Sequence, residues 1–205
     1  MPAKAWFPTF VYEAPLKARG ADELGRALLQ DCHALRESDT EGKLWCQDNY
    51  PAGYTSYGTL RRVHRMNPSF AKLERMIWPH VKRFARRIDM DLRDASLAMT
   101  DCWVNIMSRE SVHPLHVHPG ATFSGTYYVS TPPGCAGIHF EDPRLEKAML
   151  APPKLASPRR ENRQKITYEA KAGNVILFES WLGHGVASNP TVDERVSISF
   201  NYTWV

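Results

Sequence analysis

The sequence lacks any apolar run long enough to cross a bilayer, which would need about 20 consecutive apolar residues. Residues 1–10 contain Pro2, Lys4 and Pro8 and lack the apolar stretch of a secretory signal peptide. Internal repeats and low-complexity tracts are also missing, which excludes repeat architectures. We therefore expect a cytoplasmic protein with no membrane partner.

Cysteines are few, and the excess of positive charge is small. The cysteines, Cys32, Cys46, Cys102 and Cys135, are far apart and form no C-x-x-C pair, which favours free thiols in a reducing compartment. The formal net charge is +4, with 26 Lys and Arg interspersed among 22 Asp and Glu. Such a mixed surface gives no reason to expect nucleic acid as a partner.

The length of 205 residues, 43% of them hydrophobic, is enough for one substantial core but hardly for two. We predict a single domain over residues 1–205. Residues 1–95 should be mainly helical support, and residues 96–205 should form a β core. A loop insertion is expected near residues 142–164, where a Pro-, Lys- and Arg-containing stretch is too long for a hairpin turn and could serve as a lid or substrate loop.

Two helices are predicted in the first half. Between Ala21 and Arg36, leucines recur at helical spacing and leave polar residues on the opposite face. A second helix should begin at Asn67-Pro68, because asparagine is a good N-cap and proline suits the first helical position. Apolar residues then continue at steps of three or four to Ile88.

From Leu97 onward, short runs are rich in β-branched and aromatic residues and are separated by Gly and Pro, which predicts strands. The predicted strands are Leu97 to Met107, Phe123 to Ser130, Gly137 to Phe140, Lys165 to Tyr168, Asn174 to Glu179 and Arg195 to Trp204. This pattern favours a mainly β fold with flanking helices. We expect a double-stranded β-helix, the cupin-like jelly-roll barrel, buttressed by the N-terminal helices.

Three histidines are candidate metal ligands. The strand period of two puts His116 and His118 on one face, while His113 falls outside that pattern. Far downstream, His184 follows an apolar strand and a turn, and a jelly roll can return it beside the first pair. Three ligands on one side of an octahedral ion leave its other positions open.

Polar and apolar residues alternate strictly in the last predicted strand. Arg195 and Ser197 share the polar face, whereas Val196 and its alternate neighbours form an apolar one. If the apolar face packs on the helices, the polar face looks into the barrel, where a buried guanidinium needs an anionic partner. A bound carboxylate would supply it, with bidentate contacts from Arg195 and a hydroxyl contact from Ser197. The alternative is an exposed edge strand whose polar side faces water.

This arrangement resembles the 2-oxoglutarate- and Fe(II)-dependent oxygenase superfamily, which has an H-x-D/E strand, a distal His, and an Arg-x-Ser about ten residues later. The matching segments are His116-Val-His118, His184 and Arg195-Val-Ser197. Further segments are similar to a bacterial and phage group of these oxygenases, namely Trp103-Val-Asn105, Ser124-Gly-Thr-Tyr-Tyr-Val129, Phe140-Glu-Asp-Pro-Arg144 and Arg195-Val-Ser-Ile-Ser-Phe-Asn201. The resemblance covers roughly the second half of the chain.

The resemblance implies an enzyme that binds Fe(II), 2-oxoglutarate and O2 and couples oxidation of a substrate C–H bond to formation of succinate and CO2. The resemblance implies that Arg195 and Ser197 bind the co-substrate. Asn105 and Tyr127 are further candidates for co-substrate binding because of their positions in the chain. No catalytic residue is expected other than the metal ligands. His118 departs from the family pattern, which has a carboxylate there. Glu141 and Asp142 are therefore the alternative third ligands if His118 does not bind the metal itself but contacts a residue that does.

Two other classes of function remain open from the sequence. A cupin-like metal protein without 2-oxoglutarate, of the thiol dioxygenase or isomerase type, also has a Gly-His after an apolar strand, as in Gly183-His184. A non-catalytic jelly roll that binds a ligand is the third class. The Arg195-Val-Ser197 segment favours the oxygenase. The sequence specifies neither the substrate, a small molecule or a peptide, nor the oligomeric state.

Overall fold

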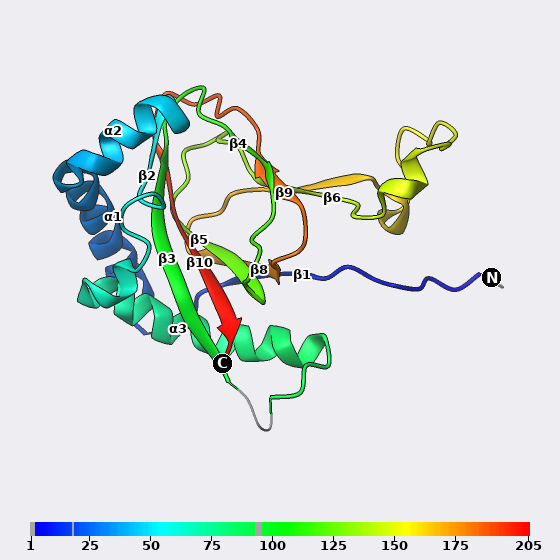
Figure 1. Cartoon of the computed structure of the whole chain (residues 1–205), viewed down its shortest axis with the longest axis horizontal. Helices are drawn as coiled ribbons and strands as arrows, with labels where there is room; N and C mark the ends of the chain where they lie inside the picture. Colours follow the sequence, from blue (N-terminus) through cyan, green and yellow to red (C-terminus); the bar gives the residue numbers. More distant parts are fainter. Residues whose placement is uncertain (1–2, 18, 93–95) are drawn as a thin grey trace.

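The computed structural model describes residues 3–17, 19–92 and 96–205, which form two antiparallel β-sheets with helices beside them (Figure 1). The larger sheet contains, in spatial order, β1 (Val11–Pro15), β8 (Asn174–Glu179), β5 (Phe123–Ser130), β10 (Arg195–Trp204), β3 (Leu97–Met107) and β2 (Gly53–Thr55). The smaller sheet contains β4 (His113–His116), β9 (His184–Val186), β6 (Ile138–Glu141) and β7 (Lys165–Tyr168).

The chain winds between the two sheets in the manner of a jelly roll. From β3 to β6 and again from β8 to β10, successive strands alternate between the larger and the smaller sheet, and β6 and β7 form a hairpin in the smaller one. The predicted jelly roll is therefore confirmed. Among the described residues no strand pairs across the two sheets, so the fold is a double sheet rather than a closed barrel.

In the described part of the first half of the chain there are three α-helices, namely α1 (Ala21–Ser38), α2 (Thr40–Asn49) and α3 (Pro68–Arg87). Both predicted helices are confirmed, and the Asn67 side chain caps α3 by accepting a hydrogen bond from the Ser69 amide at 2.9 Å. Helix α2 was not predicted. It buries just Gly42 and Cys46, so it has no apolar stripe from which helical spacing could be read.

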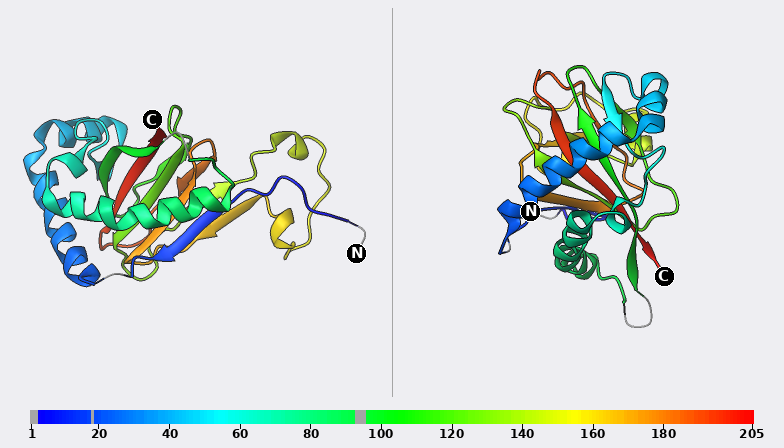
Figure 2. Two further views of the ribbon diagram at one scale, coloured as in Figure 1. Left: turned by 90° about the horizontal axis from the view of Figure 1, so that it is seen from below. Right: turned by 90° about the vertical axis from the view of Figure 1, so that its left-hand side faces the viewer.

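Helices α1 and α3 pack against the larger sheet and close one side of the core, and α3 lies across its strands (Figure 2). Leu28 of α1 and Ile77 of α3 are fully buried, and the rings of Phe84 and Phe123 lie 5.0 Å apart between α3 and β5. Each such side chain contributes about 1.5–3 kcal/mol through burial. One hydrophobic core therefore joins helices and sheets.

The six strands predicted by range are present to within one residue, but three short strands, β1, β2 and β9, were missed. Strands β1 and β2 add to the edges of the larger sheet, so residues 1–95 contribute strands as well as helices. Strand β4 contains His113 and ends at His116, so His118 lies beyond the strand and not on its face. No helix in the described part of the chain has the length and apolarity needed to span a membrane.

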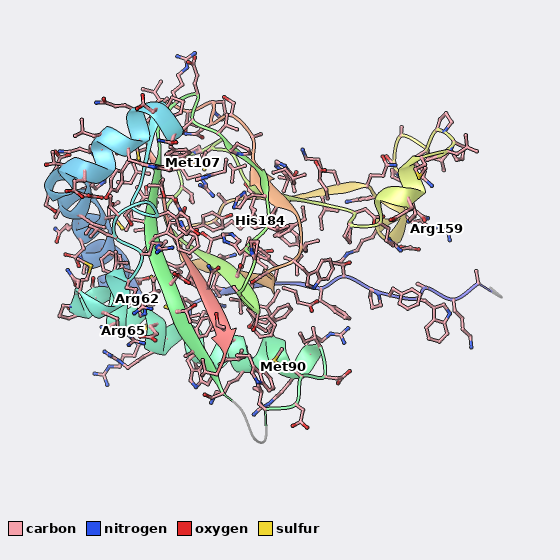
Figure 3. The ribbon with its side chains drawn as sticks, viewed as in Figure 1. Arg62, Arg65, Met90, Met107, Arg159 and His184 are labelled. Atoms are coloured by element: carbon pink, nitrogen blue, oxygen red, sulfur yellow. The ribbon has the colours of Figure 1, made fainter. Side chains whose placement is uncertain are left out.

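The insertion between β6 and β7 projects away from the two sheets, next to the N-terminal segment (Figures 1 and 2). It contains two short 3-10 helices, η2 (Leu145–Ala148) and η3 (Arg160–Asn162), and most of residues 149–164 are exposed. Arg159 in this loop lies far from His184 (Figure 3). Residues 142–164 therefore do not cover the site in this structure, and their basic side chains face solvent. Their role as a lid or substrate loop stays a prediction.

Candidate metal and co-substrate site

His116, His118 and His184 come together at one end of the two sheets. The ligand atoms of the three side chains lie within 4.8 Å of one another, and the Nε2 atoms of His118 and His184 are 3.2 Å apart. An octahedral ion with metal–nitrogen bonds of about 2.1 Å places neighbouring nitrogens about 3 Å apart. The cluster therefore has the spacing of a metal site, although β4 supplies His116 alone and the following turn supplies His118.

Backbone carbonyl groups orient two of these imidazoles. His116 Nδ1 lies 2.7 Å from the Pro114 carbonyl oxygen, and His184 Nδ1 lies 2.9 Å from that of Leu182. In each case the ring donates its Nδ1 proton to the carbonyl, which leaves the Nε2 lone pair free for a metal. Such outer partners fix both the tautomer and the ring direction of a metal-binding histidine.

The cluster also favours neutral imidazoles, the form that binds metal. Burial and the neighbouring His116 ring lower the pKa of His118 from 6.5 to about 4. Burial is likewise the main reason that the pKa of His184 falls to about 3. Both rings are therefore unprotonated at neutral pH and ready to act as ligands.

The alternative carboxylate ligands lie elsewhere. Glu141 is half-exposed and lies 3.8 Å from Lys165 Nζ across the β6–β7 hairpin. The Asp142 carboxylate accepts hydrogen bonds from the side chain of Arg144, at 2.8 and 3.0 Å. Because neither residue lines the cavity at the histidines, the prediction of Glu141 or Asp142 as substitute ligands is wrong.

Arg195 lies at the start of β10, a central strand between β3 and β5, so the edge-strand alternative is wrong. Its side chain is 2% exposed, its guanidinium carbon lies 5.0 Å from the centre of the Tyr128 ring, and its Nη1 donates to Met107 Sδ at 2.9 Å. Its Nε is buried with no hydrogen-bond partner. Among the described residues no carboxylate pairs with this guanidinium, which fits a site for an anionic ligand.

The inward face of β10 continues with Ser197 and Ser199, which line the same cavity as Arg195 and the three histidines. Asn105 on β3 lies opposite Ser197 and also lines the cavity. Its amide oxygen accepts from Thr55 at 2.8 Å and its amide nitrogen donates to Ser199 at 3.0 Å, which leaves one amide N–H for a ligand. Ser197 and Asn105 thus line the cavity that also contains Arg195, and their co-substrate role stays a prediction.

Tyr127 does not point into the cavity, as its predicted role in co-substrate binding would require. Its hydroxyl points to α1, 3.9 Å from the position of a Cβ on Gly25, on the far side of the larger sheet from the cavity. The prediction that Tyr127 binds the co-substrate is therefore wrong. Strand alternation instead turns Thr126 into the cavity and places Tyr128 beneath Arg195. The polar residues Ser124 and Thr126 at alternate positions were the sequence signal for this face.

The cavity has a volume of about 520 Å³ including its open mouth and runs from the histidine cluster to Arg195. Trp103 and His113 are among the lining residues that were not predicted to contribute. Trp103 packs beside His118, with ring centres 5.6 Å apart and an angle of 42° between the ring planes, on one side of the metal cluster. His113 of β4 is paired with Val186 of β9 in the smaller sheet, and the two side chains lie next to each other on the cavity wall.

Comparison with known proteins agrees with this geometry. Residues 101–201 match the family model described as "Putative 2OG-Fe(II) oxygenase". This segment contains the complete histidine cluster together with Arg195 and Ser197. No curated protein sequence matches the chain.

Solved structures share the fold at low sequence identity. HygX from Streptomyces hygroscopicus, crystallised with nickel, 2-oxoglutarate and hygromycin B, is 16% identical with a TM-score of 0.61, over 95% of this chain and 83% of that one. The α-ketoglutarate-dependent non-haem epimerase SnoN from nogalamycin biosynthesis is 12% identical with a TM-score of 0.63, over 95% and 78%. A Pseudomonas putida prolyl-4-hydroxylase is 13% identical with a TM-score of 0.57, over 95% and 92%.

The jelly roll, the histidine cluster and the family match together define the class. Residues 101–201, which contain the site, are similar to the 2-oxoglutarate- and Fe(II)-dependent oxygenases. The protein is a non-haem iron oxidoreductase of the type that uses Fe(II), 2-oxoglutarate and O2. The recognition made from the sequence is confirmed.

Proposed function

We propose that this protein oxidises a C–H bond of a small-molecule or peptide substrate, as a hydroxylase-type dioxygenase, with the iron held by His116, His118 and His184. The observation that carries the proposal is the single cavity that joins three metal-ready imidazoles to a buried guanidinium without a carboxylate partner among the described residues. A cytoplasmic location is part of the proposal, because the four cysteines are free thiols.

The residues fit both groups that the family requires. The Nε2 lone pairs of His116 and His184 are directed by carbonyl contacts, and His118 Nε2 has the spacing of a neighbouring ligand. Three neutral imidazoles leave the doubly positive charge of Fe(II) uncompensated, so an anionic co-substrate is favoured beside it. When bound, iron, 2-oxoglutarate and O2 would together supply the oxidising chemistry, in which the co-substrate loses CO2 and takes one oxygen atom of O2 to become succinate while the other oxygen atom enters the substrate.

The chain's own contribution is to position the co-substrate and to exclude water. Arg195 would bind the distal carboxylate of 2-oxoglutarate through its planar pair of donors, and Ser197 and Asn105 would each add a hydrogen bond. The buried Arg195 Nε is a donor that gains a partner when this carboxylate binds. Trp103 lines the cavity beside His118 and would limit access of water to the metal.

The test is an anaerobic titration of the Fe(II) protein with 2-oxoglutarate, which should produce the weak visible charge-transfer band of a metal chelate. With O2 and ascorbate present, succinate should then accumulate slowly above a control without enzyme, even in the absence of the true substrate. Alanine substitution at each of His116, His118 and His184 should abolish both signals.

One result would favour a different function. If the protein bound Fe(II) tightly but did not bind 2-oxoglutarate at millimolar concentration, the result would favour a cupin-like metal enzyme that works without this co-substrate. Such an outcome would leave the three-histidine assignment intact, but it would remove the role proposed for Arg195.

A further inference from the structure

A pair of aromatic side chains, the buried Tyr50 and the half-buried His113, lies near Arg195 and takes no part in the function described above. Tyr50, at the C-terminal end of α2, is 5% exposed, and its hydroxyl oxygen lies 2.9 Å from Nε2 of His113. The two rings are stacked, with their centres 4.6 Å apart and an angle of 25° between their planes. Tyr50 lies outside the segment 101–201 that matches the family, so this contact comes from the helical half of the chain.

His113 faces the cavity that contains Arg195. Burial and the nearby Arg195 guanidinium lower its pKa to about 3, so the ring is neutral at neutral pH. It lies in β4 three residues before His116 and opposite Val186 of β9. The ring therefore stands in the smaller sheet, while Arg195 faces the cavity from the larger one.

The Tyr50 contact determines which ring nitrogen of His113 can serve a ligand. Burial raises the pKa of the Tyr50 hydroxyl, so this group is protonated at neutral pH and can donate a hydrogen bond. A neutral imidazole has one donor and one acceptor nitrogen. If Tyr50 donates to Nε2, the proton of His113 must be on Nδ1, which makes Nδ1–H a donor for an anion.

We propose that His113, held by Tyr50, is a second anchor for the distal carboxylate of 2-oxoglutarate, which it meets from the sheet opposite Arg195. This inference rests on the proposed function and adds two positioning residues to it. The carboxylate would receive charge-assisted contacts from Arg195 on one side and the Nδ1–H of His113 on the other. The pair would thus select for 2-oxo acids that carry a second carboxylate at this distance.

The experiment measures the dissociation constants of 2-oxoglutarate and pyruvate for the anaerobic Fe(II) protein, because pyruvate has the same chelating end but no distal carboxylate. His113→Leu should weaken 2-oxoglutarate binding roughly tenfold to hundredfold, the effect of losing a hydrogen bond to a charged group, and should leave pyruvate binding within about twofold. Tyr50→Phe removes one hydroxyl and should weaken 2-oxoglutarate binding roughly twofold to tenfold.

Two further variants separate a specific contact from a general packing effect. His113→Asn keeps an N–H donor near the position of Nδ1 and should recover part of the affinity that His113→Leu loses. Tyr127→Phe is the matched control, because its hydroxyl lies on the opposite side of the larger sheet, and it should bind 2-oxoglutarate as the wild type does. Iron stoichiometry and thermal unfolding are recorded for every variant.

The outcomes distinguish this inference from the proposed function. If the wild-type Fe(II) protein does not bind 2-oxoglutarate, the proposed function itself is wrong. If the wild type binds it and the Tyr50→Phe and His113→Leu variants bind it equally well, the function stands and the second anchor is overturned. Equal losses for 2-oxoglutarate and pyruvate, or equal losses for His113→Asn and His113→Leu, would also overturn it, because they indicate packing rather than recognition of the distal carboxylate.

Discussion

Replacing Arg195 by lysine keeps a positive charge at the inner end of the cavity but removes the planar guanidinium. Arg195 is 2% exposed and makes one side-chain hydrogen bond to Met107, and its Nε has no partner. A carboxylate bound there can accept two parallel hydrogen bonds from arginine but just one well-directed bond from lysine. The substitution therefore tests the geometry of this site and not merely its charge.

The size of the effect follows from the loss of one charge-assisted hydrogen bond, about 1.5–3 kcal/mol, which weakens 2-oxoglutarate binding roughly tenfold to hundredfold. The assay is the anaerobic titration of the Fe(II) protein followed by the visible chelate band. Iron content should stay unchanged, because Arg195 is not part of the histidine cluster.

Arg159→Lys is the matched control, because this arginine is exposed on the projecting loop far from His184 (Figure 3). It should bind 2-oxoglutarate with the affinity of the wild type. An unchanged dissociation constant for Arg195→Lys would refute the reasoning, since it would mean that the guanidinium does not contact the co-substrate.

Three further predictions concern the metal, pH and the core. His184→Ala should abolish stoichiometric Fe(II) binding in a metal assay, whereas His139→Gln should retain iron because His139 lies outside the cluster. Burial lowers the pKa of His64 below 6.5, so His64 binds a proton more readily in the unfolded chain than in the folded one. The contribution of His64 to the unfolding free energy is therefore present above pH 6.5 and is lost as the pH falls below it. His64→Gln should flatten this part of the pH profile of the unfolding free energy. Leu28 is fully buried, so Leu28→Ala should lower the unfolding free energy, measured by denaturant unfolding, by about 2–5 kcal/mol. Leu44 is exposed, and an equally large decrease for Leu44→Ala would contradict the assignment of the core.

Local rules were enough where the signal is contained in one segment. Asn67 and Pro68 predicted the start of α3, because capping involves an asparagine side chain and an amide two residues away. Strict alternation in β10 predicted that Arg195 and Ser197 face inward, because successive side chains of a strand point to opposite faces. The same alternation could have corrected Tyr127, since Ser124 and Thr126 share the inward parity of β5.

The sequence by itself therefore determined the jelly roll, the three histidines and the inward face that presents Arg195, since each depends on periodicity or on short spacing. The tertiary structure decided what depends on contacts between distant segments: the direction of the 142–164 loop, the placement of Glu141 and Asp142 outside the cavity, and the meeting of Tyr50 with His113. These last two residues are 63 positions apart and belong to a helix end and a strand of different halves. No local pattern encodes such a contact, because it forms through the packing of the whole core.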